Sequence, residues 1–337
     1  MRNLGIVLSL AVVGAFLAAA PSLAQTKQPE ADVPGATSAP VQSSLVVGAL
    51  QIGSAANLEV MGIDINIASD SIVYSYFFKN SRAAELSLTA AVSLPKLQTS
   101  ADRSETWILG SNDPENPVGL TITAAGASVT TKAEVHAYAL GFDRLAEIKA
   151  EHLPLIPFGP EIDKALAGLS PEASDRLAAL GIISPRDPAQ PNAPAMADWS
   201  LDVVLSWRQV LPPGKTTPIA VKFTPVVAQY RMAKGDLENL DDMKDEACLK
   251  PQVLAALQSR LKGSGAWQVT EISVDASGPA HWIDNPNATL SVQKPKPDAI
   301  VSFCGMDDKS ASRPTVLGVA PDDSDEIRIV IFEPAAK

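Results

Sequence analysis

Residues 199–223 read WSLDVVLSWRQVLPPGKTTPIAVKF. The first half of this stretch alternates apolar and polar side chains, which is typical of a strand buried on one face. Its apolar members are Trp199, Leu201, Val203, Leu205 and Trp207. Pro212-Pro213-Gly214 then marks a turn, and a second strand presents Ile219, Val221 and Phe223. The pattern predicts a β-hairpin with a buried aromatic face.

The same alternation recurs upstream. Strands are predicted at 58–67, 72–78 and 86–94, joined by short polar turns, and we expect them to form an antiparallel meander. The apolar positions change phase across Met61-Gly62, which predicts a β-bulge in the first strand. Two more strands are expected near 119–124 and 128–140.

Helical periodicity follows at about 143–182. Asp143 is a candidate N-cap for a first short helix, and Pro160 and Pro171 each begin another. An amphipathic helix is predicted from Pro251 to Gly263. The remaining strands are expected near 267–274, 289–293, 299–304 and 327–332. The chain is therefore predicted to be mainly β (α+β), an antiparallel β-sandwich-like body with a short helical insertion and one amphipathic helix in its C-terminal half.

The first 44 residues predict export. Arg2 precedes an apolar run from Leu4 to Ala20, and Ser22 and Ala24 supply the small side chains that signal peptidase needs. The alternative is an uncleaved anchor, but the run is short of the roughly 20 residues that span a bilayer. We predict cleavage after Ala24 and a periplasmic location.

The mature chain is expected to begin with a flexible linker at 25–44, which has almost no large apolar side chains. Residues 45–337 are predicted to form a single β-rich domain, with a candidate sub-boundary near 230–247. Pro, Gly or charge interrupts every later apolar run, so no integral membrane span is expected in the mature chain.

Charge and cysteine content narrow the partners and the compartment. The chain has 38 acidic and 27 basic residues, a net charge of -11, which argues against nucleic acid and anionic membranes as partners. We expect a protein or small-molecule partner in the cell envelope. The two cysteines, Cys248 and Cys304, predict a disulfide in an exported protein, and two buried free thiols are the alternative.

Several short segments also occur in one order and spacing that resemble a known family. They are Phe78-Lys79-Asn80-Ser81, Leu94-Pro95, Leu153-Pro154-Leu155, Pro157-Phe158, Trp207, Leu211-Pro212-Pro213-Gly214, Phe223-Thr224-Pro225 and Val301-Ser302-Phe303-Cys304. On these residues the chain resembles the uncharacterised exported proteobacterial family called domain of unknown function forty-four twenty-four. The resemblance implies an exported location and a shared fold. It implies no established activity and no catalytic residues.

Few residues of the chain point to chemistry. The three histidines, His136, His152 and His281, have no partner at metal-ligand spacing. The most site-like cluster is a candidate ligand-binding set in a loop containing Gly and Pro: His281, Trp282, Asp284 and Asn285. No nucleophile elbow, phosphate loop or dinucleotide fingerprint occurs, so no catalytic residue, metal site or cofactor is predicted.

Three classes of function remain open, and a structural component of the envelope is the third. The leading hypothesis is a non-enzymatic interaction or ligand-binding module. The alternative is a hydrolase or metal-dependent enzyme whose residues converge from distant segments. That enzyme requires two of the three histidines to lie within about 5 Å of each other or of a buried carboxylate in a cleft.

Overall fold

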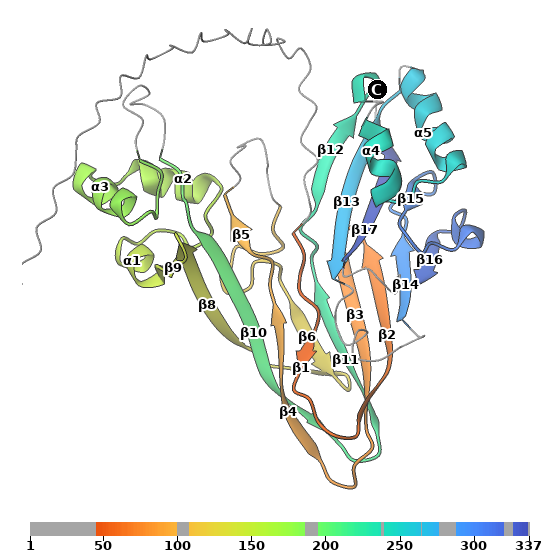
Figure 1. Cartoon of the computed structure of the whole chain (residues 1–337), viewed down its shortest axis with the longest axis horizontal. Helices are drawn as coiled ribbons and strands as arrows, with labels where there is room; N and C mark the ends of the chain where they lie inside the picture. The colour runs from red at the N-terminus through yellow and green to blue at the C-terminus, as the bar shows by residue number, and fades with distance from the viewer. Residues whose placement is uncertain are drawn as a thin grey trace, which may run out of the picture. The chain divides into compact units, whose positions relative to one another are not determined.

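The computed structural model describes residues 45–99, 108–185, 195–236, 239–263, 265–275, 288–319 and 326–335. All of them belong to one contact unit, Ser38–Lys337. The signal segment predicted at 1–24 and the linker predicted at 25–44 lie outside the described residues, and both stay predictions. Mainly antiparallel sheets form the described part, so the predicted mainly β fold class is confirmed (Figure 1).

The strands of the described residues form three sheets. The six-stranded sheet has the order β1 (Gln51–Ile52), β4 (Leu86–Ser93), β10 (Ser200–Leu211), β8 (Lys132–Ala139), β9 (Phe142–Asp143), and β5 (Leu97–Gln98) also pairs with β10. The seven-stranded sheet has the order β16 (Thr315–Val319), β14 (Ala288–Gln293), β2 (Leu58–Ala68), β3 (Ser71–Asn80), β11 (Thr216–Phe223), β6 (Thr121–Ala124), β7 (Ala127–Ser128). The four-stranded sheet has the order β12 (Ala228–Met232), β13 (Trp267–Asp275), β17 (Glu326–Pro334), β15 (Ile300–Ser302). Among the described pairs, only β14 and β2 run parallel.

The helices lie in two groups (Figure 1). The insertion between β9 and β10 contains α1 (Leu145–Ala150), α2 (Pro160–Ala167) and α3 (Pro171–Ala179). Between β12 and β13 lie α4 (Asn239–Glu246) and α5 (Pro251–Lys262), with short 3₁₀ turns at Lys234–Asp236 and, after β15, Asp308–Ser310. The insertion and α5 were predicted, whereas α4 was not. Apolar side chains of α4 and α5 pack on Trp267, Val269, Val330 and Phe332 of the four-stranded sheet.

The hairpin predicted for residues 199–223 is wrong. Both strands form, but β10 pairs with β4 and β8, while β11 pairs with β3 and β6 in another sheet. The turn at Pro212-Pro213-Gly214 is therefore a crossing between sheets. Alternation shows which face of a strand is buried, and it does not show which strand lies beside it. Two facing sheets bury both apolar faces in one core, so either arrangement satisfies the pattern.

The predicted three-strand meander is wrong in the same way. β2 and β3 pair as expected, with the bulge between Val60 and Gly62, but β4 crosses to the six-stranded sheet. One buried side chain, Asn80, ties both crossings together. Its amide donates to the carbonyls of Ala84 (3.0 Å) and Leu211 (2.9 Å), and its oxygen accepts from the backbone of Arg82.

The main core lies between the three sheets. It contains the inward faces of β2, β3, β4, β10 and β11 together with Ile272, Val274, Ile329 and Ile331 of the four-stranded sheet. Stacked rings of Tyr74, Tyr76, Phe78 and Phe223 run along it. A smaller second core lies under α1, α2 and α3 and includes Trp199 and Ala137 at the ends of β10 and β8. This second core holds the insertion against the six-stranded sheet.

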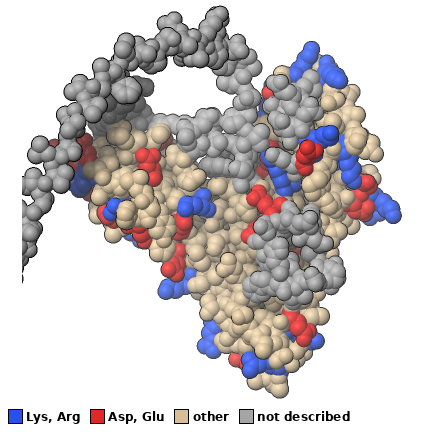
Figure 2. Space-filling view, viewed as in Figure 1, with Lys and Arg blue, Asp and Glu red and all other residues tan. Residues whose placement is uncertain are grey.

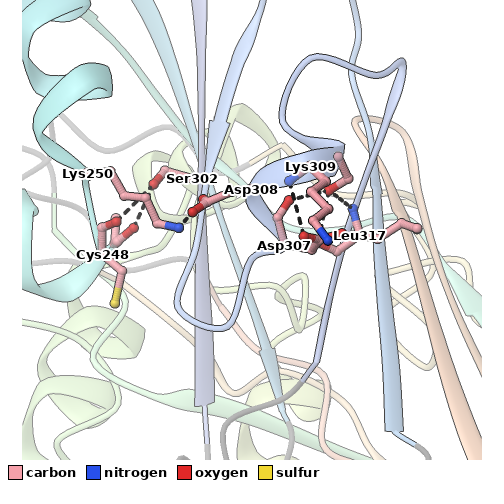
Figure 3. A network of polar contacts seen from close by, with 9 residues as sticks. Cys248, Lys250, Ser302, Asp307, Asp308, Lys309 and Leu317 are labelled. Carbon is pink, nitrogen blue, oxygen red and sulfur yellow. Dashed lines mark hydrogen bonds and ion pairs between the residues drawn. The ribbon is translucent and has the colours of Figure 1, made fainter.

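The predicted disulfide is present. Cys248 and Cys304 are bonded, with their Cα atoms 5.0 Å apart. Beside it, the Ser302 hydroxyl donates to the carbonyl of Ala247 (2.9 Å), and Lys250 forms an ion pair with Asp308 (Figure 3). Covalent and polar contacts therefore join the α4–α5 connection to β15 and the turn that follows it.

Candidate functional site

The ligand-binding set predicted from sequence, His281, Trp282, Asp284 and Asn285, lies outside the described residues. Among the residues that the structure describes, no group of three or more His, Cys, Asp or Glu side chains is placed to hold a metal ion. Acidic and basic side chains are interspersed on the visible face, with uncharged surface between them (Figure 2).

A pocket of about 560 Å³ opens at the edge of the helical insertion. We call it the insertion pocket. It is lined by Leu109, Asn112, Pro114, His152, Leu153, Pro154, Leu155, Ile156, Phe158, Gly159, Pro160 and Glu161. Three segments contribute: the loop before β6, the connection between α1 and α2, and the first turn of α2. Its volume falls in the range of small-molecule sites, roughly 300–1,000 Å³.

Two hydrogen bonds fix the connection that forms the apolar floor. The indole N–H of Trp199 donates to the carbonyl of Leu155 (2.9 Å), and the Thr99 hydroxyl donates to the carbonyl of Pro157 (2.8 Å). Trp199 is almost fully buried. Leu155, Ile156 and Phe158 are half-buried and pack against the main core. The floor is thus held by the rigid sheet rather than by loop contacts alone, as a preformed site requires.

His152 stands at the mouth of this pocket because of how α1 ends. The N–H of Leu153 bonds to the carbonyl of Ile148 and the N–H of His152 to that of Lys149, a Schellman arrangement. His152 is the left-handed residue of this motif, with φ 56°. Glycine usually takes that position, and Gly181 does so, with φ 70°, where α3 ends. A bulky residue at this φ carries local strain that functional sites often retain.

The polar groups of the insertion pocket are Asn112, His152 and Glu161. They come from three different short segments, while the rest of the lining is mostly apolar. Among the described residues, none bonds to the His152 imidazole, so its nitrogens are open to a ligand. The arrangement offers hydrogen bonds at the rim and apolar contact below. It offers no paired nucleophile and base.

His136 lies outside the insertion pocket, on the solvent face of β8. Its Nδ1 lies 2.7 Å from the Asp143 carboxylate and its Nε2 lies 3.3 Å from that of Glu134. The ring stacks on Tyr138. Asp143 was predicted as the N-cap of α1, but it precedes the actual N-cap, Arg144, and its carboxylate accepts from the Leu145 backbone. Both ring nitrogens of His136 bond to partly exposed carboxylates, so the side chain stabilises the β8–β9 hairpin. It does not lie beside a buried carboxylate, as the enzyme hypothesis requires.

The surroundings of His136 give a testable pH dependence. Hydrogen bonds that His136 makes to Asp143 and then to Glu134 raise the pKa of His136 above its usual 6.5, and the bond with His136 lowers the pKa of Asp143. A pKa raised by folding means that this contribution to stability is full below about pH 6.5 and is lost as pH rises through the folded pKa. We expect Asp143→Asn to lower the pKa of His136, measured by NMR titration of its imidazole. An unchanged pKa in the variant would contradict the pairing, and Asp175→Asn on α3 serves as the control.

One short segment of the sequence could have located the insertion pocket, although the composition of the chain gave no indication of it. Leu153-Pro154-Leu155 and Phe158, which carried part of the family resemblance, line it together with Ile156. Pro154 and Pro157 disfavour helical backbone at the residues before them, which keeps α1 and α2 apart. The other wall, at Leu109 and Asn112, is distant in sequence, and no local pattern relates it to the first.

Comparisons with known proteins identify the family of the chain. A family model described as domain of unknown function (DUF4424) matches residues 41–323. No curated protein matches the chain. A crystal structure of a proposed nutrient-binding protein from Legionella pneumophila shares 10% identity, with a TM-score of 0.36 over 86% of this chain and 73% of that one. In the described part of the chain, none of the helices has the length and apolar character to cross a membrane.

Proposed function

The chain belongs to the family described as domain of unknown function (DUF4424), and we propose that it is an exported, non-enzymatic binding module that holds a small amphipathic molecule in the insertion pocket. The observation that carries this proposal is the pocket itself. It combines a fixed apolar floor with three polar groups at the rim, the usual composition of a small-molecule site. The location proposed is the periplasm, on the strength of the segment from Arg2 to Ala24.

The lining indicates which molecules fit. Leu155, Ile156 and Phe158 offer apolar contact, so the buried part of the ligand is apolar. Asn112 both donates and accepts hydrogen bonds, and the ring nitrogens of His152 add further hydrogen-bonding positions. The ligand therefore carries a hydrogen-bonding group at one end, near Asn112 and His152, and an apolar body that reaches Phe158.

Native mass spectrometry of the mature protein, purified from its own envelope extract, tests the proposal. We expect one small molecule per chain, released on denaturation and then identified by its mass. Binding at a site of this composition survives gentle purification when its dissociation constant is about micromolar or tighter. A chain that carries no small molecule from that extract would contradict a ligand-binding role.

The substitution His152→Gly tests the backbone strain at this position and the binding of the ligand as two separate effects. Removing the side chain at a left-handed position should leave the free energy of unfolding unchanged or raise it by up to about 1 kcal/mol. The same change removes a hydrogen-bonding group from the rim, so retention of the co-purified molecule should fall about tenfold. Urea unfolding and native mass spectrometry read the two effects separately.

The matched control is Asn57→Gly. Asn57 is also left-handed, with φ 67°, and it lies outside the pocket. It should show the same change in stability with full ligand retention. Equal retention in both variants would remove His152 from the binding site.

A further inference from the structure

A second concave site lies on the solvent face of the six-stranded sheet. This pocket of about 410 Å³, called here the sheet-face pocket, is lined in part by Lys96, Gln98, Thr99, Tyr138, Asp198 and Ser200. It is separate from the insertion pocket, and Trp199 links the two. Trp199 lines the sheet-face pocket, while its indole N–H bonds to the carbonyl of Leu155, which lines the insertion pocket.

Strand register explains how three polar side chains meet in this pocket. Ser200 of β10 lies directly opposite Gln98 of β5 on one side and opposite Tyr138 of β8 on the other. Residues opposite one another in neighbouring strands project from the same face of a sheet. Gln98, Ser200 and Tyr138 therefore form one row across three strands, fixed by the backbone ladder.

Most of the charged side chains near this row have an ion-pair partner. In the next row, Asp202 lies 3.5 Å from the Lys96 ammonium and opposite His136, which is itself bound to Asp143 and Glu134. Asp198 is different. Among the described residues, none donates a hydrogen bond to its carboxylate or pairs with it.

The environment of Asp198 favours a cationic partner. Partial removal from water raises the pKa of this carboxyl, and no positive group offsets that cost. Lys96, the lining cation, is directed to Asp202. The pocket therefore carries one exposed carboxylate that has no ion-pair partner among the described residues, and an aromatic ring in the same lining. Ammonium groups bind favourably near both features.

We propose that the sheet-face pocket binds the primary ammonium group of a small polar molecule. Asp198 accepts hydrogen bonds from the ammonium group, and Tyr138 presents its ring beside the cation. Gln98 and Ser200 bond to the polar remainder of the molecule. The proposal is independent of the ligand in the insertion pocket, because it rests on different residues and a different chemistry.

NMR titration of the mature protein with ethanolamine, and separately with ethylene glycol, tests the charge requirement. The two probes differ by one ammonium group in place of one hydroxyl. We expect ethanolamine to shift the backbone amide signals of Tyr138 and Ser200 in a saturable manner, with at least tenfold weaker binding of ethylene glycol. Equal shifts from the two probes, or none from ethanolamine, would overturn the proposal.

Asp198→Asn tests the residue. It should weaken ethanolamine binding at least tenfold, whereas Asp175→Asn, an exposed substitution on α3, should leave it unchanged. The backbone N–H of Asp198 bonds to the carbonyl of Ile182 and is retained in the variant, so the fold is expected to persist, as circular dichroism would show. Full binding by a folded Asp198→Asn variant would overturn the assignment. Further titrations with glucosamine and glycinamide distinguish an amino sugar from a peptide amine as the source of the ammonium group.

Discussion

Replacing Arg328 with methionine should lower the free energy of unfolding by about 3–5 kcal/mol, one of the two largest effects we expect in this chain. Glu271 of β13 is only 1% exposed, and its Oε2 accepts two hydrogen bonds from the Arg328 guanidinium. The Tyr230 hydroxyl donates to Oε1 at 2.7 Å. Without Arg328, a carboxylate is left buried with its main counter-charge gone.

Burial acts against both charges of this pair. It raises the pKa of Glu271 and lowers that of Arg328, in each case towards the neutral form. The pair therefore contributes little net stability compared with apolar residues of similar size, although breaking it is costly. The triple variant Glu271→Leu, Arg328→Met, Tyr230→Phe should accordingly recover most of the loss.

Urea unfolding of the four proteins measures these effects. The control is Lys79→Met, which removes the exposed Lys79–Glu59 ion pair and should cost less than about 1 kcal/mol. A loss below 1 kcal/mol in Arg328→Met would show that the pair is not buried as described.

Loss of the disulfide should have a comparable effect. Cys248 and Cys304 are separated by 56 residues, and the loop-entropy model assigns about 4 kcal/mol to closing such a loop. We expect Cys248→Ser with Cys304→Ser to lower the free energy of unfolding by about that amount. Reduction of the native protein with dithiothreitol should have a similar effect, and it should leave the double variant unchanged.

A second double variant isolates the backbone contribution. Cys248 is the left-handed residue that ends α4, with φ 49°, and the next N–H bonds back to the carbonyl of Lys244. Cys248→Gly with Cys304→Ser should therefore be more stable than the double serine variant by up to about 1 kcal/mol. A disulfide effect below 1 kcal/mol in both variants would contradict the loop-closure estimate.

Local patterns predicted the strands better than their partners. The alternation in β10 and β11, the bulge after Val60 and the proline-initiated helices α2, α3 and α5 were all visible in the sequence. Sheet membership was not, because a strand's periodicity contains no information about its neighbours. Asn80 shows why: it fixes both crossings through contacts with Ala84 and Leu211, and in the sequence it is only a turn residue.

The sequence also did not reveal that β13 and β17 are buried on both faces. Glu271 and Arg328 lie in strands whose alternation predicts one solvated face, yet α4 and α5 cover the face of β13 and β17 opposite the main core. A charged residue on such a face needs a buried partner, and the partner is 57 residues away. The two pockets could not be predicted either, because their lining residues are distant in the sequence. The insertion pocket and the sheet-face pocket each bring together segments that only the fold makes adjacent.

A fluorescence titration with N-phenyl-1-naphthylamine, an uncharged apolar probe with one N–H group, tests the binding role of the insertion pocket most directly. Asn112→Trp fills the rim of the pocket from an exposed position, and Val210→Trp places the same side chain at an exposed position of β10 that lines no part of it. We predict saturable binding of one probe per chain in the native protein and in Val210→Trp, and at least tenfold weaker binding in Asn112→Trp. Equal affinity in the two tryptophan variants, or no saturable binding in the native protein, would contradict a ligand site in the insertion pocket.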